Sequence, residues 1–157
     1  MTNEVWSIKL DAAIKECDAH VSRLDRAYIL LGDFFPLSPA SLSSLDELRI
    51  EHVDQFVFRF SRLQDAMGAR LFPSVYVLLA GDTGSHPFID ILMTLEKFNV
   101  IEDAQKWQFF RDLRNNLAHE YPDSVEESSG TLNLLREKWP EFRTMYLKVK
   151  TFAQSHM

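Results

Sequence analysis

The stretch LDAAIKECDAHVSRLDRAYILLGDFF, residues 10–35, decides the fold class. Its apolar side chains follow one another at alternating spacings of four and three residues, which places them on one stripe of a long helix. The stripe consists of Leu10, Ile14, Cys17, Val21, Leu24, Tyr28, Leu31 and Phe35. Because proline cannot continue the hydrogen-bond ladder of a helix, Pro36 and Pro39 are predicted to end it, and residues 37–43 are predicted to form a loop.

The C-terminal part of the chain repeats this pattern. The alternating stripe here is Leu132, Leu135, Trp139, Phe142, Tyr146, Val149 and Ala153. Ser124 and Glu127 have the spacing of a capping box that would open the helix. Pro140 predicts either a kink or a division into two helices. The long stripes near the two chain ends are also suited to a dimer interface.

The middle of the chain predicts three further helical segments. Ser44 and Glu47 form a second candidate capping box, and the helix that follows should end or kink at Pro73. Residues 75–80 are apolar and partly β-branched, so a strand is possible. A helical turn is favoured because no other segment offers a strand to pair with it.

A turn rich in Gly, Asp and Pro then occupies residues 81–87, and helices are expected over residues 88–97 and 101–119. The resulting fold class is all-α: a four- to five-helix up-and-down bundle that is expected to form a dimer.

Length and composition limit the possible functions. With 157 residues, of which 46% are apolar, residues 1–157 are expected to form a single helical domain. The net charge of −6 argues against a protein that coats nucleic acid by bulk charge, although a local basic site stays possible. The single Cys17, the absence of a signal-like N-terminus and the lack of a long apolar run indicate a cytoplasmic protein.

The segment RDLRNNLAHEY, residues 111–121, holds the candidate site. Asn115 and His119 are four residues apart and share a helix face, and the long side chain of Arg114 can reach the same place. A cation, an amide and an imidazole thus gather at a helix end. The structural alternative is that Arg114 and His119 only interact with the helix dipole while Tyr121 packs.

The pattern Arg-Asn-x-x-x-His-x-Tyr over residues 114–121 resembles the signature of HEPN proteins of the HepT type. The resemblance implies a metal-independent endoribonuclease without cofactors, in which two chains line one RNA cleft. His119 would serve as general base or acid, because an imidazole titrates near neutral pH. Arg114 would hold the phosphate, and Asn115 would orient the substrate or His119.

The same resemblance implies a partner. In HepT-type toxins of toxin–antitoxin pairs, a minimal nucleotidyltransferase antitoxin adenylylates the Tyr of the motif, which makes Tyr121 a candidate modification site. Added phosphates beside Arg114 would block RNA by charge and bulk. Two alternatives remain: a non-catalytic HEPN module that binds a nucleotidyltransferase, and a purely structural helical dimer in which the motif is a coincidence.

Other candidate residues favour structural roles. Asp82, Thr83 and Gly84 copy the aspartic-protease triplet, but that chemistry needs a β scaffold, so a turn is expected. Asp65 could position Arg114 across the bundle, although an exposed carboxylate is the favoured expectation. Cys17 lies on the apolar stripe and is expected in the core. No glycine-rich phosphate loop or zinc-ligand spacing is present.

Overall fold

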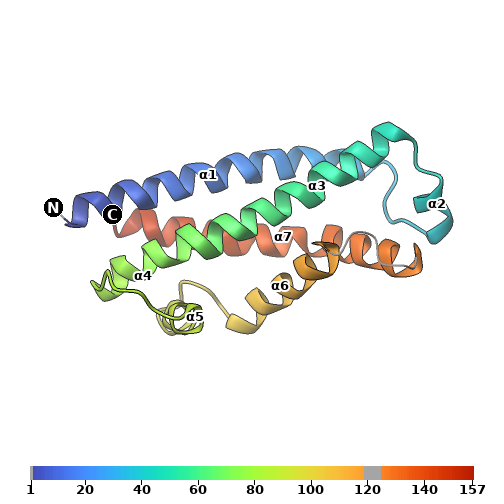
Figure 1. Ribbon diagram of the computed structural model, residues 1–157. Coiled ribbons are helices and arrows are strands. Elements are labelled where there is room, and N and C mark those ends of the chain that lie inside the picture. The colour runs from blue at the N-terminus through green and yellow to red at the C-terminus, as the bar shows by residue number, and fades with distance from the viewer. Residues whose placement is uncertain (1, 119–124) are drawn as a thin grey trace.

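A computed structural model of the chain describes residues 2–118 and 125–157, and these form an elongated bundle of helices (Figure 1). No strand occurs in these two ranges, so the all-α prediction is confirmed. His119, Tyr121 and the Ser124 half of the predicted capping box lie outside the described residues. In the described ranges, no helix is both long and apolar enough to cross a lipid bilayer.

The described elements are, in chain order, α1 (Thr2–Leu31), α2 (Pro39–Ser43), α3 (Glu47–Ala66), the π-helical turn η1 (Met67–Leu71), α4 (Phe72–Ala80), α5 (Phe88–Lys97), α6 (Ala104–Ala118) and α7 (Val125–Ser155). Because α3, η1 and α4 follow one another without a break, they form one continuous helical segment. The long segments run along one axis, with α1 beside α3 and α7, while the shorter α5 and α6 lie along one side (Figure 1).

The predicted apolar stripes of α1 and α7 pack against the rest of the same chain. Along α1 and α7 the stripe residues are almost all buried, and they belong to one hydrophobic core cluster that also takes in α3, α4, α5 and α6. The suggestion that these two stripes form a dimer interface is therefore wrong, because their apolar area already packs within this chain. A second copy would have to use other faces.

The segment around α3 differs from the prediction in two ways. Its N-cap is Asp46, whose side chain accepts a hydrogen bond from the backbone of Arg49, so the predicted cap at Ser44 is wrong. Pro73 does not end the helix. The π-helical turn η1 ends two positions earlier, and Pro73 lies in the first turn of α4, where the missing N–H of proline is tolerated. Residues 75–80 are helical, as favoured.

The region between α1 and α3 is not a plain loop. The helix α1 ends at Leu31, before the predicted prolines, and residues 39–43 form the short helix α2. Ser38 and Ser41 cap α2 reciprocally, and Pro39 suits its first turn. The side chain of Asn133 on α7 holds both backbone groups of Leu37, at 2.7 and 2.8 Å. This pairing, invisible to local sequence patterns, fixes the region against α7.

Pro140 lies inside α7, which runs as one helix from Val125 to Ser155. Of the two predicted alternatives, a kink or a division into two helices, the division is therefore wrong. Proline removes one backbone hydrogen bond at this position. The neighbouring Trp139 and Phe142 are buried and hold both halves of α7 in the core. Tertiary packing thus outweighs the local cost of the proline.

Tyr146 joins the two long terminal helices by its hydroxyl group. The side chain is fully buried in α7, and its hydroxyl lies 2.7 Å from a carboxylate oxygen of Asp18 and 3.1 Å from the backbone carbonyl of Ile14, both on α1. Burial, reinforced by the bond to Asp18, raises the pKa of the Tyr146 phenol far above its usual value. The phenol therefore stays protonated in the folded chain.

Replacing Tyr146 with Phe should lower the free energy of unfolding at pH 7 by about 2 kcal/mol, because a buried hydrogen bond to a carboxylate is lost. A tyrosine whose pKa is raised by folding loses its stabilising contribution as the pH rises above the unfolded value of about 10. The difference between wild type and Tyr146→Phe should therefore shrink above that pH. Urea unfolding at pH 7, 10 and 11 measures it, and a pH-independent difference would contradict the argument.

Candidate functional site

The candidate site depends on how α6 is anchored. Its first turn is capped by Asp103, whose carboxylate accepts a hydrogen bond from the backbone of Gln105 at 2.7 Å. The helix thus begins at Ala104, a few residues later than expected. Trp107, Phe110 and Leu113 are buried, and this inward face turns Arg114 toward α3.

Two arginines of α6 converge on one carboxylate of α3. Arg114 donates to Asp65 with its Nη2 at 3.0 Å, and Arg111 lies 3.6 Å from the other oxygen of the same carboxylate. Asp65 is partly buried and pairs with both arginines, so the alternative in which it positions Arg114 across the bundle fits better than a solvent-exposed carboxylate. Two positive charges against one negative charge leave this spot locally cationic in an acidic protein.

Arg114 and Arg111 are held to different degrees. The Arg114 side chain is 23% exposed, and its Nε is buried without a hydrogen-bond partner among the described residues. Arg111 is 41% exposed and makes the longer contact. Arg114 is thus fixed by Asp65, whereas Arg111 has room to move. Lys106, a further cation on α6, does not join this group and pairs with Glu102 and Glu141.

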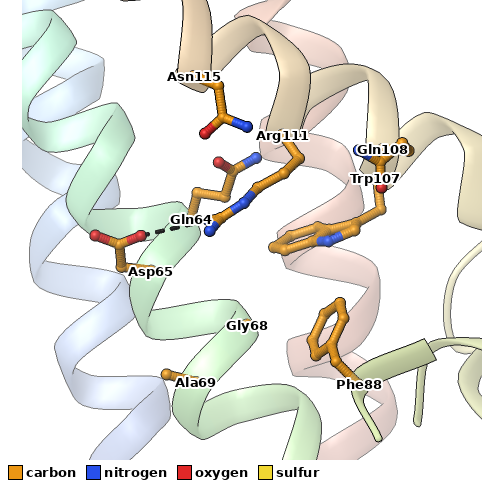
Figure 2. A pocket seen from close by; sticks show the side chains of 9 residues that line it. All are labelled: Gln64, Asp65, Gly68, Ala69, Phe88, Trp107, Gln108, Arg111 and Asn115. Atoms are coloured by element: carbon orange, nitrogen blue, oxygen red, sulfur yellow. Dashed lines mark ion pairs between the residues drawn. The ribbon is translucent and has the colours of Figure 1, made fainter. Parts of the chain in front are cut away.

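A pocket of about 670 Å³ opens between α3, α5 and α6, next to this ion-pair group (Figure 2). Its described lining comes from α3 and η1 (Gln64, Asp65, Gly68, Ala69), from α5 (Phe88) and from α6 (Trp107, Gln108, Arg111, Asn115). One wall is aromatic and the other carries amides and charges. A cavity of this size with a few convergent polar groups is typical of small-molecule sites.

The predicted site residues divide into two groups. Arg114 lies in the ion pair with Asp65, and Asn115 is exposed at the pocket rim, one residue further along α6. His119 and Tyr121 lie outside the described residues. Of the three residues predicted to lie together, Arg114, Asn115 and His119, the structure therefore describes only the first two.

Gln64 is the residue that sequence reasoning missed. It is completely buried and borders the pocket, yet neither its amide nitrogen nor its amide oxygen has a hydrogen-bond partner among the described residues. The sequence did hold a signal: a glutamine stands on the buried face of α3, four residues after Phe60 and directly after Leu63. Polar residues inside an apolar stripe need a partner or a function.

The remaining candidates behave as structural residues. Cys17 is fully buried, and burial raises the pKa of its thiol to about 12, so it stays protonated in the core, as expected. Asp82 accepts a hydrogen bond from the backbone of Gly84 at 2.8 Å, which makes the predicted turn. In the part of the chain that the structure describes, no three His, Cys, Asp or Glu side chains gather as metal ligands would.

The all-helical bundle, with an Arg-Asn pair near the end of a late helix beside a pocket, is consistent with a HEPN-type fold. Among proteins of known name, the chain is similar to the probable ribonuclease HepT of Haemophilus influenzae. The two are 27% identical over 135 residues, which cover 77% of this chain and 90% of the relative. This likeness supports the HepT-like family within the HEPN proteins. No protein-family profile matches the chain, and no solved structure matches it significantly.

Replacing Asp65 with Asn should lower the free energy of unfolding by only about 0.5–1 kcal/mol, because the pair with Arg114 is partly exposed and screened by water. The loss should become smaller in 0.5 M salt, where charge interactions are shielded over a few ångströms. Urea unfolding at low and high salt measures both effects.

The matched control is Asp112→Asn, which changes an exposed carboxylate on α6 that accepts a hydrogen bond only from Gln108 among the described residues. Equal salt dependence in the two variants would mean that Asp65 does not hold the arginines in solution.

Proposed function

We propose that this chain is a metal-independent endoribonuclease that acts as the toxin of a toxin–antitoxin pair. The observation that carries the proposal is the Arg114 guanidinium, held by Asp65 at the edge of the pocket, five positions before His119 in a motif of HepT type. The likeness to a protein named probable ribonuclease HepT supports the same activity.

The chemistry needs only groups that the motif supplies. In RNA, the 2′-hydroxyl attacks the adjacent phosphorus once it loses its proton, and the bond from phosphorus to the 5′-oxygen of the next nucleotide breaks. His119 would take the proton from the hydroxyl or give one to the leaving oxygen. Arg114 would hold the phosphate and stabilise the charge that builds on its oxygens. DNA lacks the 2′-hydroxyl and should resist cleavage.

Asp65 would act as a positioning residue for Arg114. An arginine that is free in solution loses side-chain entropy when it binds a phosphate, and fixing it beforehand removes much of this cost. The carboxylate also lowers the net positive charge, so it weakens the pull on any single phosphate. Arg111 makes only a long contact with Asp65, so its positive charge would remain available for a neighbouring phosphate of the same strand.

Two copies of the chain would complete the site. Acid–base cleavage needs a proton acceptor and a proton donor, and the motif provides one histidine per chain. A homodimer that brings two copies of the motif together would supply both. Because the α1 and α7 stripes are buried within the chain, such a dimer would form through the end of α6 and its surroundings.

Replacing His119 or Arg114 with Ala should reduce RNA cleavage in excess chelator by at least about a hundredfold, because each removes a group that acts in the transition state. The measurement is the initial rate on total RNA with purified, partner-free protein. His52→Ala is the matched control: this histidine lies on α3, away from the pocket, and its loss should leave the rate unchanged.

Two results would contradict the proposal. The first is a folded His119→Ala protein that cleaves RNA as fast as wild type. The second is a wild-type protein that leaves RNA intact although its mass shows no modification. The second result would favour the non-catalytic module that binds a nucleotidyltransferase.

Neutralisation would occur at Tyr121. A minimal nucleotidyltransferase antitoxin would transfer adenylyl groups to its hydroxyl, which places negative charge close to Arg114 in sequence. The added phosphates would compete with RNA for the same guanidinium. This part of the proposal requires no contact between Tyr121 and the pocket.

Replacing Tyr121 with Phe should leave RNA cleavage within about threefold of wild type and abolish the adenylyl mass after incubation with a nucleotidyltransferase antitoxin and ATP, because the accepting oxygen is gone. Intact-mass spectrometry reads the modification, and the chelator assay reads the activity. Tyr28→Phe, on α1, is the matched control and should still be modified. Equal modification of wild type and Tyr121→Phe would place the acceptor elsewhere.

A further inference from the structure

The completely buried Gln64 is the most unusual polar group among the described residues. Its primary amide carries two donor hydrogens and an acceptor oxygen, and neither end has a partner in the described parts of the chain. Leaving such a group unpaired in a folded interior destabilises the protein, so buried amides are nearly always satisfied. An unsatisfied amide that borders a cavity therefore points to a ligand that completes it.

The neighbours of Gln64 define the chemistry of that ligand (Figure 2). The opposite wall holds Phe88, which is 39% exposed, and an edge of the buried Trp107, with ring centroids 6.1 Å apart. The partly exposed ring of Phe88 can accept the face of an aromatic heterocycle, and the Trp107 edge closes the wall beside it. Arg111, at the same pocket, supplies a positive charge suited to a phosphate.

Gly68 keeps the aromatic wall close to the polar one. A side-chain carbon at this position would lie 3.3 Å from the Trp107 ring and 3.9 Å from the Phe88 ring. Any larger residue here would occupy space between the rings and the Gln64 side of the pocket. The pocket thus combines a stacking surface, an amide that can both donate and accept, and a cation.

We infer that this pocket binds an unpaired adenine base of the RNA strand, with the Gln64 amide on the adenine edge and Arg111 on a flanking phosphate. A glutamine amide pairs with adenine through two hydrogen bonds, since adenine presents a donor N6 amine beside an acceptor nitrogen. Single-stranded RNA is typically recognised in this way, by stacking and by its base edges. The inference rests on the proposed ribonuclease function and gives it a base preference.

Entry of the base requires one local movement. The Gln64 amide is closed off from bulk water, so a flexible neighbour must move aside before a base can reach it. Arg111 is the suitable side chain, because it is partly exposed and its contact with Asp65 is long, at 3.6 Å. A phosphate that draws Arg111 outward would open the amide and leave Arg114 on Asp65.

Calorimetric titration of the full chain with AMP, GMP, CMP and UMP tests the base. AMP should bind most tightly, and Gln64→Leu should weaken it about tenfold or more, the loss expected for a bidentate pair. Because Leu removes an unsatisfied polar group, Gln64→Leu should melt no lower than wild type, which separates lost binding from lost folding. Gln105→Leu, an exposed position on α6 outside the pocket lining, should bind AMP as wild type does.

A second arm distinguishes an RNA strand from a free nucleotide. Tetra-adenylate with 2′-O-methyl groups cannot be cleaved through its 2′-oxygen, and it should bind more tightly than AMP and more tightly than the matching tetra-uridylate. Binding of AMP without binding of the oligonucleotide would overturn the RNA assignment. Equal affinity of wild type and Gln64→Leu for every probe would overturn the role of Gln64.

These results separate the inference from the proposed function. Cleavage that depends on His119, together with binding that ignores Gln64, would refute the base pocket and leave the ribonuclease standing. Adenine binding that depends on Gln64, with RNA left intact by wild type, would support the pocket and refute the ribonuclease.

Discussion

The packing of aromatic rings between α3, α6 and α7 is the constraint on which the site depends. Phe142 of α7 lies against Phe60 of α3, with ring centroids 5.2 Å apart, and against Phe110 of α6, at 4.7 Å. Such contacts stabilise cores beyond the area that they bury, and they also fix the register between helices. Asp65 follows Phe60 by little more than one turn, and Arg114 follows Phe110 by one turn. The rings therefore decide that this carboxylate and this guanidinium meet.

The fold follows from the sequence largely because its helices carry long, regular apolar stripes. Leu10 to Leu31 and Leu132 to Ala153 face the core as the alternating spacing predicts. Local rules were less successful at the segment ends. Asp46 replaced Ser44 as the cap of α3, and α2 formed where a loop was expected. The pairing of Asn133 with Leu37, which fixes this region against α7, joins residues 96 positions apart. Sequence periodicity carries no information about pairings of that kind.

The site was predicted only in part for a related reason. The motif places Arg114 and Asn115 on α6 from sequence alone, but the partner of Arg114 comes from α3, 49 positions earlier. Asp65 has no sequence feature that separates it from a solvent-exposed acid. Gln64 does, since it interrupts an apolar face, but only the cavity beside it shows why an amide stands there. The residues that give a site its selectivity can thus be harder to find than those that match a motif.

The π-helical turn η1 links the fold to the pocket. A turn with i→i+5 bonds, such as that from Phe72 to Met67, inserts an extra residue into the helix and is common at functional sites. Here it begins directly after α3, contributes Gly68 and Ala69 to the pocket lining, and precedes Pro73. One residue of an α-helix corresponds to about 100° of rotation about its axis. Without the extra residue in η1, the side chains of α4 would therefore point about 100° away from their present direction relative to α3. The irregular turn thus brings small residues to the pocket wall, with Gly68 next to the Trp107 ring, and it does so without ending the helix that carries Asp65.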